Sequence, residues 1–272
     1  MLALFSRLAA LFPEPATAPA DAPLCRGGDL GPVRLLAAYS RGIFPWYGPG
    51  LPLLWWSPDP RCVLPLADFH LPRRSARSLR ASGFSVTLDA AFGRVISACA
   101  APRPGPEPPG TWLTPEMLTA YERLHSFGYA HSIETWRDGK LVGGLYGVAL
   151  GRAFFGESMF HVESEASRAA LAALVGLLRR RGATLLDCQQ ATPHMERMGA
   201  TLLPRDEFLR QLAAALAPAG EDAARPQDDA EPRLSPWAPW RERYVFCGPC
   251  GDASPDVWAE RAEKARAAKG RS

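Results

Sequence analysis

Three long apolar segments in the middle of the chain, separated by two short turns, restrict the fold more than any other feature. They cover residues 131–137, 141–150 and 153–160, and the turns between them are Asp138-Gly139 and Gly151-Arg152. Two-residue turns that contain glycine are typical of tight hairpins. The pattern therefore predicts three consecutive strands that pair in antiparallel order.

The residues that follow predict a long helix and then a fourth strand. Four apolar residues between 171 and 178 recur at the spacing of one helix face, and Gly182 can end the helix after three arginines at 179–181. The apolar run 185–190 stops before Pro193 and has the pattern of a strand. Strands, a helix and a further strand in this order indicate an α+β fold.

Two polar side chains in the run 185–190 are candidates for chemistry. Period-two alternation places Asp187 and Gln189 on one face of the predicted strand. Their Cα atoms would lie roughly 6.5–7 Å apart, so Asp187 could accept a hydrogen bond from the side-chain amide of Gln189. Such a pair would orient an attacking amine and stabilise the charge that it gains. The alternative is that Asp187 is a buried acid paired with an arginine that holds the sheet together.

An acidic residue also interrupts the apolar strand at 153–160. Alternation places Phe155, Glu157 and Met159 on the same face. A buried carboxylate is costly unless it is paired or hydrogen-bonded, so Glu157 requires a polar partner. That partner is either an arginine, in a structural salt bridge, or the charged amine of an acceptor. Gly156 beside it indicates a bulge or a close approach of the backbone.

Aromatic and basic residues before this region are consistent with RNA as a partner. Trp46, Trp55 and Trp56 lie close together in the sequence, and Trp112 precedes a helix start at Thr114-Pro115. Packing is the commoner role of any one tryptophan, but an aromatic face also stacks on a base of single-stranded RNA. A basic cluster consists of Arg73, Arg74, Arg77 and Arg80. It forms either a solvated helix face or a set of phosphate contacts.

Composition favours a soluble cytoplasmic protein without a metal or a nucleotide cofactor. The net charge of +3 permits a polyanionic partner without requiring one. The six cysteines and five histidines show no metal-ligand spacing, and the first twelve residues lack the basic start of a secretion signal. The tail motif Cys247-Gly-Pro-Cys250 has too few residues after it for a thioredoxin-like fold, and we assign it no role.

The chain closely resembles the leucyl/phenylalanyl-tRNA–protein transferases over roughly residues 25 to 210. The resemblance rests on five segments in the order and spacing of that family: RGIFPWY (41–47), WWSPDPR (55–61), GTWLTPEM (110–117), LVGGLYGVALGRAFFGESMF (141–160) and LLDCQQATPHMERMGA (185–200).

This resemblance implies an activity and a domain plan. Leu or Phe, and also Met, would be moved from aminoacyl-tRNA to the N-terminal Arg or Lys of acceptor proteins, which marks them for N-degron degradation. The enzyme would be a monomer with no cofactor and no membrane association. We expect a small N-terminal domain at 1–60, a GNAT-like catalytic domain with a mixed sheet and flanking helices at 61–217, and a linker and tail at 218–272.

The resemblance also assigns roles to individual residues. Trp46 and Trp112 would contact the 3′ end of the aminoacyl-tRNA, and Glu157 would bind the acceptor. Asp187 and Gln189 would carry the transfer step. For the amino-acid side chain we expect an apolar pocket lined by Phe154, Leu174 and Leu178, unless these three only pack the helix onto the sheet. With tRNA as substrate, the four arginines between 73 and 80 become candidates for phosphate contacts.

Two other functions compete with this interpretation. A GNAT-like fold would also suit an acyl-coenzyme A N-acyltransferase, but such enzymes hold pyrophosphate on a glycine-rich turn. The corresponding turn at 161–166 contains no glycine and carries two acids. A non-catalytic RNA-binding module would use tryptophans and arginines alone, and it would have no reason to place Glu157, Asp187 and Gln189 on strands.

Overall fold

The computed structural model describes residues 11–101 and 112–217. The predicted linker and tail at 218–272, with Cys247 and Cys250, lie outside the described residues, as do residues 1–10 and most of the proline-rich segment that follows residue 100. None of the described helices is long and apolar enough to cross a membrane.

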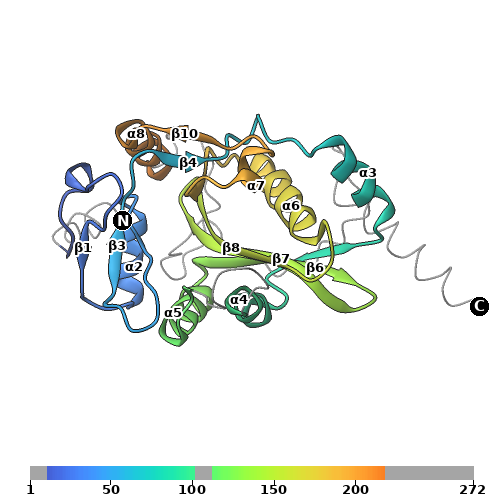
Figure 1. Ribbon diagram of the computed structural model, residues 1–272, viewed down its shortest axis with the longest axis horizontal. Helices are drawn as coiled ribbons and strands as arrows, with labels where there is room; N and C mark the ends of the chain where they lie inside the picture. The colour runs from blue at the N-terminus through green and yellow to red at the C-terminus, as the bar shows by residue number, and fades with distance from the viewer. Residues whose placement is uncertain (1–10, 102–111, 218–272) are drawn as a thin grey trace, which may run out of the picture.

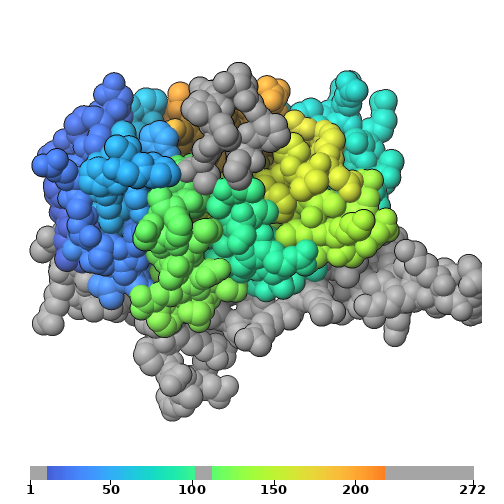
Figure 2. Space-filling model, turned by 60° about the horizontal axis from the view of Figure 1, so that its bottom comes forward, coloured from blue at the N-terminus to red at the C-terminus, as the bar shows by residue number. Residues whose placement is uncertain are grey.

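The N-terminal segment, residues 11–60, contains a small three-stranded sheet. A short 3-10 turn, η2 (Pro15–Thr17), precedes it. Its strands β1 (Cys25–Arg26), β2 (Phe44–Pro45) and β3 (Leu54–Trp56) lie in the order β1-β3-β2, all antiparallel, and α2 (Pro32–Tyr39) lies between the first two in sequence. Figure 2 shows this N-terminal segment, in blue, packed beside α5 (Pro115–Ser126), in green.

A seven-stranded mixed sheet forms the main body, in the order β10-β4-β9-β8-β7-β6-β5. The strands are β4 (Arg61–Val63), β5 (Ser85–Leu88), β6 (Ala130–Arg137), β7 (Lys140–Leu150), β8 (Ala153–His161), β9 (Leu185–Gln189) and β10 (Thr201–Leu203). The helices are α3 (Arg73–Ala81), α4 (Phe92–Ala100), α5, α6 (Ala166–Arg180), α7 (Pro193–Glu196) and α8 (Arg205–Leu216). The predicted α+β fold, a mixed sheet with flanking helices, is confirmed.

Local sequence signals produce the centre of this sheet. Strands β6, β7 and β8 pair as consecutive antiparallel neighbours, as predicted. At the first turn both Asp138 and Gly139 have positive φ, 48° and 74°, which is the backbone that a tight hairpin of this twist requires. Helix α6 ends before Gly182, whose φ of 66° is left-handed.

The helices cover the two faces of the sheet separately, as Figure 1 shows: α6 lies on one face, and α4 and α5 lie on the other. Leu171, Leu174 and Leu178 of α6 pack with Phe154 and Leu186 in one apolar cluster. A second cluster combines α4 and α5 with residues of the N-terminal segment and α8. The N-terminal segment therefore shares a core with the main body.

Strands β8 and β9 are parallel but pair only over a short length. Their register is Ala153↔Leu185 and Phe154↔Leu186, and it ends at Phe155↔Asp187. Beyond these pairs β8 continues to His161 and β9 to Gln189, but the two strands no longer pair with each other. The two strands thus separate at the level of Glu157 and Gln189, and polar side chains can stand between them.

A β-bulge in β8 lies at this level. Tyr146 pairs with Ser158 but the next residue, Gly147, pairs with Gly156, so Glu157 is the extra residue of the bulge. A Cβ atom at Gly147 would lie 2.2 Å from the carbonyl oxygen of Phe155, which only glycine avoids. The predicted irregularity beside Gly156 is confirmed. The prediction that Phe155, Glu157 and Met159 share one face was wrong for Met159. Phe155 packs on one face of the sheet and Met159 packs with the α6 cluster on the other, because the extra residue reverses the alternation.

Candidate active site

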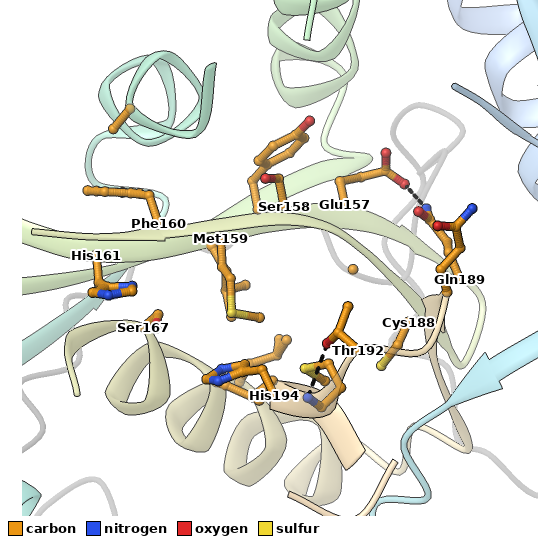
Figure 3. Close-up of a pocket in the computed structure, with 18 of the residues that line it drawn as sticks. Glu157, Ser158, Met159, Phe160, His161, Ser167, Cys188, Gln189, Thr192 and His194 are labelled. Carbon is orange, nitrogen blue, oxygen red and sulfur yellow. Dashed lines mark hydrogen bonds between the residues drawn. The ribbon is translucent and has the colours of Figure 1, made fainter. Parts of the chain in front are cut away.

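A cavity of about 1080 Å³ opens where β8 and β9 separate. Figure 3 shows Glu157 and Gln189 at one end of this cavity and His161 and Ser167 at the other, with Met159 between them on β8. Residues from the N-terminal segment, β8, β9, α6 and α7 all contribute to its wall. The cavity therefore depends on parts of the chain that are far apart in sequence.

Glu157 is the buried carboxylate of the cavity, 9% exposed. Its Oε2 accepts a hydrogen bond from the hydroxyl of Tyr121 at 2.8 Å, and its Oε1 accepts one from Nε2 of Gln189 at 2.7 Å. The hydroxyls of Tyr121 and Tyr39 lie 2.5 Å apart, which extends the network into the N-terminal segment. These partners are neutral, so among the described residues no arginine satisfies Glu157.

Burial of Glu157 raises its pKa from 4.5 to about 7. Loss of solvation is the largest cause, the hydrogen bonds from Tyr39, Tyr121 and Gln189 oppose it, and the charge of Asp187 adds to it. A carboxyl group with this pKa exchanges its proton near neutral pH. Near this pH, the Glu157 carboxyl group can bind a proton or pair with a cation at little further cost in free energy.

Asp187 is completely buried and forms an ion pair with Arg61 of β4. Nε and Nη2 of Arg61 donate to the two carboxylate oxygens at 2.9 and 2.7 Å. The guanidinium lies between the rings of Phe44 and Phe208, 4.7 and 4.6 Å from their centroids. The pairing of Asp187 with an arginine, which the sequence left as an alternative, is thus present.

The expected hydrogen bond between the side chains of Asp187 and Gln189 was wrong. Asp187 Oδ1 accepts from the backbone N–H of Gln189 at 2.8 Å, while the side-chain amide of Gln189 donates to Glu157. The physical reason is the backbone: Gln189 has a φ of 62°, and the register of β4 and β9 shifts between Cys62 and Val63. Strict alternation therefore fails at the end of β9.

The apolar part of the cavity only partly matches the predicted pocket. Leu174 lies on its wall, but Phe154 and Leu178 are buried in the cluster between α6 and the sheet and do not line it. Phe154 and Leu178 pack α6 onto the sheet. This packing role is the alternative that the sequence left open for the three pocket residues. Other apolar wall residues on the sheet and on α6 include Leu145, Met159, Phe160, Leu171 and Leu186. Sequence reasoning missed Met159 because the bulge turns this side chain toward α6.

The predicted tryptophans separate into two groups. Trp46 and Trp112 are partly exposed and line the cavity, whereas Trp55 is completely buried in the core. Trp56 packs against Trp46 with ring centroids 5.2 Å apart and donates from Nε1 to its carbonyl oxygen at 2.6 Å. The structure thus brings Trp46 and Trp112 to the same cavity as Glu157.

The four arginines of the basic cluster lie on α3, away from this cavity. All four are exposed, while Ser75 and Leu79 form the buried side of the helix. In Figure 1, α3 lies at the opposite end of the molecule from the small sheet. None of the four forms an ion pair with another residue in the described part of the chain.

Three residues of the site were not assigned from the sequence: Tyr39, Arg61 and Tyr121. A tyrosine on an amphipathic helix looks like a core residue, so Tyr39 and Tyr121 gave no usable signal. Arg61 follows the cis peptide Asp59-Pro60 in a segment that the family resemblance included. The sequence contains one indication of Arg61: an arginine is the alternative partner of Asp187, but its position could not be named.

The turn between β8 and α6 carries two ion pairs. Glu163 pairs with Arg137 at 3.0 Å and Glu165 with Arg168 at 2.6 Å. Glu165 itself has a φ of 70° at the start of α6. The turn offers paired carboxylates rather than free backbone N–H groups in a glycine loop, which does not suit a pyrophosphate. Within residues 11–101 and 112–217, no group of three or more His, Cys, Asp or Glu side chains could hold a metal ion.

Family models and curated relatives agree on one family. The family model described as "Leucyl/phenylalanyl-tRNA protein transferase" matches residues 63–213, and the model of its N-terminal domain matches residues 28–59. Similar proteins bear the name "Leucyl/phenylalanyl-tRNA--protein transferase". The one from Nitratidesulfovibrio vulgaris (strain DP4) is 59% identical over 202 residues, 74% of this chain and 86% of the relative. The one from Alkalilimnicola ehrlichii is 59% identical over 194 residues, 71% and 74% of the two chains.

Solved structures with a partly similar course of the chain include L-PGS from Bacillus licheniformis, with a TM-score of 0.36, 10% identity and 58% and 50% of the two chains covered. Another is a GCN5-related N-acetyltransferase from Kribbella flavida, with a TM-score of 0.30, 13% identity and 64% and 61% covered. The family models and the curated relatives, which span most of the described residues, carry the assignment. This chain belongs to the leucyl/phenylalanyl-tRNA–protein transferase family.

Proposed function

We propose that this enzyme transfers leucyl, phenylalanyl and methionyl groups from aminoacyl-tRNA to the N-terminal Arg or Lys of acceptor proteins, and that the product is an N-degron. Membership of the family makes the chain an aminoacyltransferase with an aminoacyl-tRNA donor and a protein acceptor. The observation that carries the finer proposal is the cavity itself. It places an apolar wall next to Glu157, a buried carboxylate that titrates near pH 7.

For the donor, we assign the aromatic and apolar parts of the cavity wall. Trp46 and Trp112 offer ring faces on which the terminal adenosine can stack. The leucines of β7, α6 and β9, together with Met159, then surround the amino-acid side chain. A pocket that recognises only apolar shape separates side chains differing by one methylene by about 1–3 kcal/mol, so Leu, Phe and Met should all be accepted.

For the acceptor, we assign Glu157. A cationic Arg or Lys side chain, or the α-ammonium group, would pair with its carboxylate in a partly dry site, where charge-assisted hydrogen bonds are strong. The approach of a cation lowers the pKa of Glu157 and keeps it ionised in the complex. An acceptor with an N-terminal Ala would lack the side-chain cation.

For the transfer step, we assign Gln189 as the group that contacts the attacking amine. Because Nε2 of Gln189 is held by Glu157, its Oε1 faces away from Glu157 and can accept a hydrogen bond from the amine. The neutral amine attacks the ester carbonyl, a C–N bond forms, and the ester C–O bond breaks. The leaving adenosine oxygen takes up the proton that the amine loses.

Asp187 then acts through Gln189 rather than on the substrate. It is completely buried, it is neutralised by Arg61, and it holds the backbone of Gln189 in its left-handed conformation. An amide is a poor base, so the pair orients the amine and stabilises the charge that the amine gains. The ester is already activated, and the required catalysis is correspondingly modest. For the exposed arginines of α3 we retain the proposal of tRNA phosphate contacts.

The test is transfer by the purified full-length chain with defined donors and acceptors. Donors are tRNAs charged with Leu, Phe, Met or Val, and acceptors are peptides that begin with Arg, Lys or Ala. We expect Leu, Phe and Met to be joined to the Arg and Lys peptides, and mass spectrometry of the peptide gives the result. Transfer from acyl-coenzyme A but not from aminoacyl-tRNA would contradict the proposal.

The role of Glu157 is tested with the same peptides and Glu157→Gln. If Glu157 binds the cationic side chain, the variant loses much of its preference for Arg and Lys over Ala. An equal loss of rate with all three peptides would show instead that Glu157 has a general structural role. Tyr121→Phe is the matched control, because it removes one hydrogen bond to the carboxyl group of Glu157 but leaves a group that can still ionise.

A further inference from the structure

Two thiols beside the cavity have no part in the proposed transfer. Cys62 on β4 is completely buried, and Cys188 on β9 is half-buried and lines the cavity. Both are free cysteines. Figure 3 shows Cys188 near Thr192, between the Gln189 end of the cavity and α7. The chain thus presents a nucleophilic sulfur atom to the space that we assign to substrates.

The strand pairing places the two thiols next to each other. Cys62 pairs with Gln189 and the following residue, Val63, pairs with Asp187, so Cys188 is the extra residue of a bulge opposite Cys62. A bulge sets two residues of one strand against a single residue of its neighbour. The thiols of Cys62 and Cys188 are in hydrogen-bond contact.

Two thiols in contact are suited to either a metal ion or a disulfide. A structural zinc site requires four ligands, and no group of three or more candidate ligands exists in the described parts of the chain. Disulfide formation requires only the two sulfur atoms and Cα atoms within about 7 Å of each other, a separation that neighbouring strands provide. The geometry therefore favours oxidation over metal binding.

We propose that Cys62 and Cys188 form an oxidation-sensitive dithiol site: a hydroperoxide that enters the cavity converts the pair to a disulfide, which slows aminoacyl transfer, and a dithiol reductant restores it. The formation of the bond stands on the geometry of the two strands alone. The effect on rate also rests on the proposed function of the neighbouring Gln189.

The chemistry balances with the peroxide as the only oxidant. The Cys188 sulfur attacks one oxygen of hydrogen peroxide, and the O–O bond breaks. The departing oxygen takes up the thiol proton and leaves as water, so that a sulfenic acid forms at Cys188. The Cys62 sulfur then attacks the Cys188 sulfur, the S–O bond breaks, and a second water leaves. Two thiols are oxidised by two electrons, and one hydroperoxide is reduced.

The electrostatics of the pair fit a slow reaction of this kind. The hydrogen bond from Cys188 lowers the pKa of the Cys62 thiol, and the same bond, together with burial, raises the pKa of Cys188 well above its usual range. Because the cavity-facing sulfur is held protonated, it should react with peroxide more slowly than an exposed thiol of low pKa. The pair would respond to sustained oxidant.

The disulfide would change the position of Gln189. Bond formation brings the sulfur atoms from hydrogen-bond contact to about 2.05 Å and ties the bulge of β9 to β4. Gln189 follows Cys188 directly, and its amide must reach Glu157 on β8, the strand on the other side of β9. A displacement of about 1 Å at such a site can lower the rate on the order of 10²-fold.

The experiment treats the full-length chain with hydrogen peroxide, blocks remaining thiols, and measures both bond and rate. Peptide mapping without reductant should find residues 62 and 188 joined, with the loss of two hydrogen atoms. Transfer should fall on the order of 10²-fold and return with dithiothreitol. Cys247→Ser with Cys250→Ser provides a background in which the tail thiols cannot contribute.

Cys62→Ser is the test variant, and Cys62→Ala replaces it if the serine is not tolerated at this buried position. Either variant should transfer normally when reduced and should show no reversible loss after peroxide. The matched control is Cys99→Ser, which removes a buried thiol elsewhere and should respond like the parent.

Two results would overturn the proposal: no 62–188 cross-link at peroxide concentrations that oxidise other thiols, or a cross-link that leaves the transfer rate unchanged. A reduced chain that does not transfer at all would instead refute the proposed function. In that case, peptide mapping would still decide whether the dithiol forms its disulfide.

Discussion

The polar residues of the site form one chain of contacts, in which each residue has a different consequence for stability. Arg61 binds Asp187, Asp187 holds the backbone of Gln189, and the side chain of Gln189 reaches Glu157. The first two are completely buried and oppositely charged, whereas Gln189 is partly exposed to the cavity. Loss of the buried pair should therefore affect the fold, and loss of Gln189 should affect mainly the rate.

This difference gives the first prediction. Asp187→Asn leaves the Arg61 guanidinium buried without a full counter-charge, so it should cost about 3–5 kcal/mol of folding free energy. Gln189→Ala should leave stability nearly unchanged and lower kcat by about 10²–10⁴. Urea unfolding and single-turnover transfer measure the two effects. A fully active Gln189→Ala variant would exclude contact between this amide and the attacking amine.

The second prediction concerns pH. The pKa of Glu157 is raised from 4.5 to about 7, so folding favours its protonated form. The stability contributed by this group is fully present below pH 4.5 and is lost as the pH rises through about 7. Glu157→Gln cannot ionise, so the wild-type chain should lose stability relative to this variant between pH 5 and pH 8, as judged by the difference in Tm. A constant difference across this range would show that Glu157 keeps an ordinary pKa.

At the scale of elements, the cavity exists because β8 and β9 pair over only three residues each and then diverge. The bulge at Glu157 turns the carboxylate toward Tyr121 and turns Met159 toward α6. Helix α6 therefore has two kinds of apolar position. Leu174 lies on the cavity wall, while Leu178, one turn later, is buried against the sheet.

A matched pair of substitutions on α6 tests this division. Leu174→Phe reduces the space in the cavity, so it should lower transfer of Phe relative to Leu by about 10-fold or more, since pocket shape is worth about 1–3 kcal/mol. Leu178→Phe adds the same volume inside the core and should lower Tm without changing the preference. Competition between Phe-tRNA and Leu-tRNA gives the ratio directly. If both variants changed the preference equally, the assigned wall would be wrong.

At the scale of the whole molecule, the N-terminal segment completes the site. Tyr39 extends the hydrogen bonds of Glu157, Phe44 covers the guanidinium of Arg61, and Trp46 lines the cavity. One apolar cluster joins this segment to α4, α5, α8 and the large sheet. The division into two domains at residue 60 remains a proposal, because buried residues next to both sheets belong to one apolar cluster.

The shared core leads to a prediction about unfolding. If the small sheet is stabilised mainly by burial against the large one, the two should unfold in a single cooperative step. Hydrogen exchange followed by mass spectrometry should then show that amides of β3 and β7 lose protection with the same free energy. Exchange of β3 at a much lower free energy, while β7 stays protected, would identify the N-terminal segment as a separately unfolding unit.

The sequence by itself determined the features that depend on neighbouring residues. Glycine and aspartate at 138–139 specify the β6–β7 hairpin, apolar spacing specifies the buried face of α6, and Thr114 caps α5 by accepting from the N–H of Met117. It also placed Trp46, Trp112, Glu157, Leu174 and Gln189 among the candidates that the structure brings to one cavity.

Only the tertiary structure decided how these side chains meet. Alternation predicts the direction of a side chain only while the register of a strand is constant, and bulges at Glu157 and Cys188 break the register at the two positions where the site forms. The contacts that fix Asp187 and Glu157 come from Arg61, Tyr39 and Tyr121. These residues lie far away in the sequence, so no local pattern carries their pairing, and folding alone brings them together.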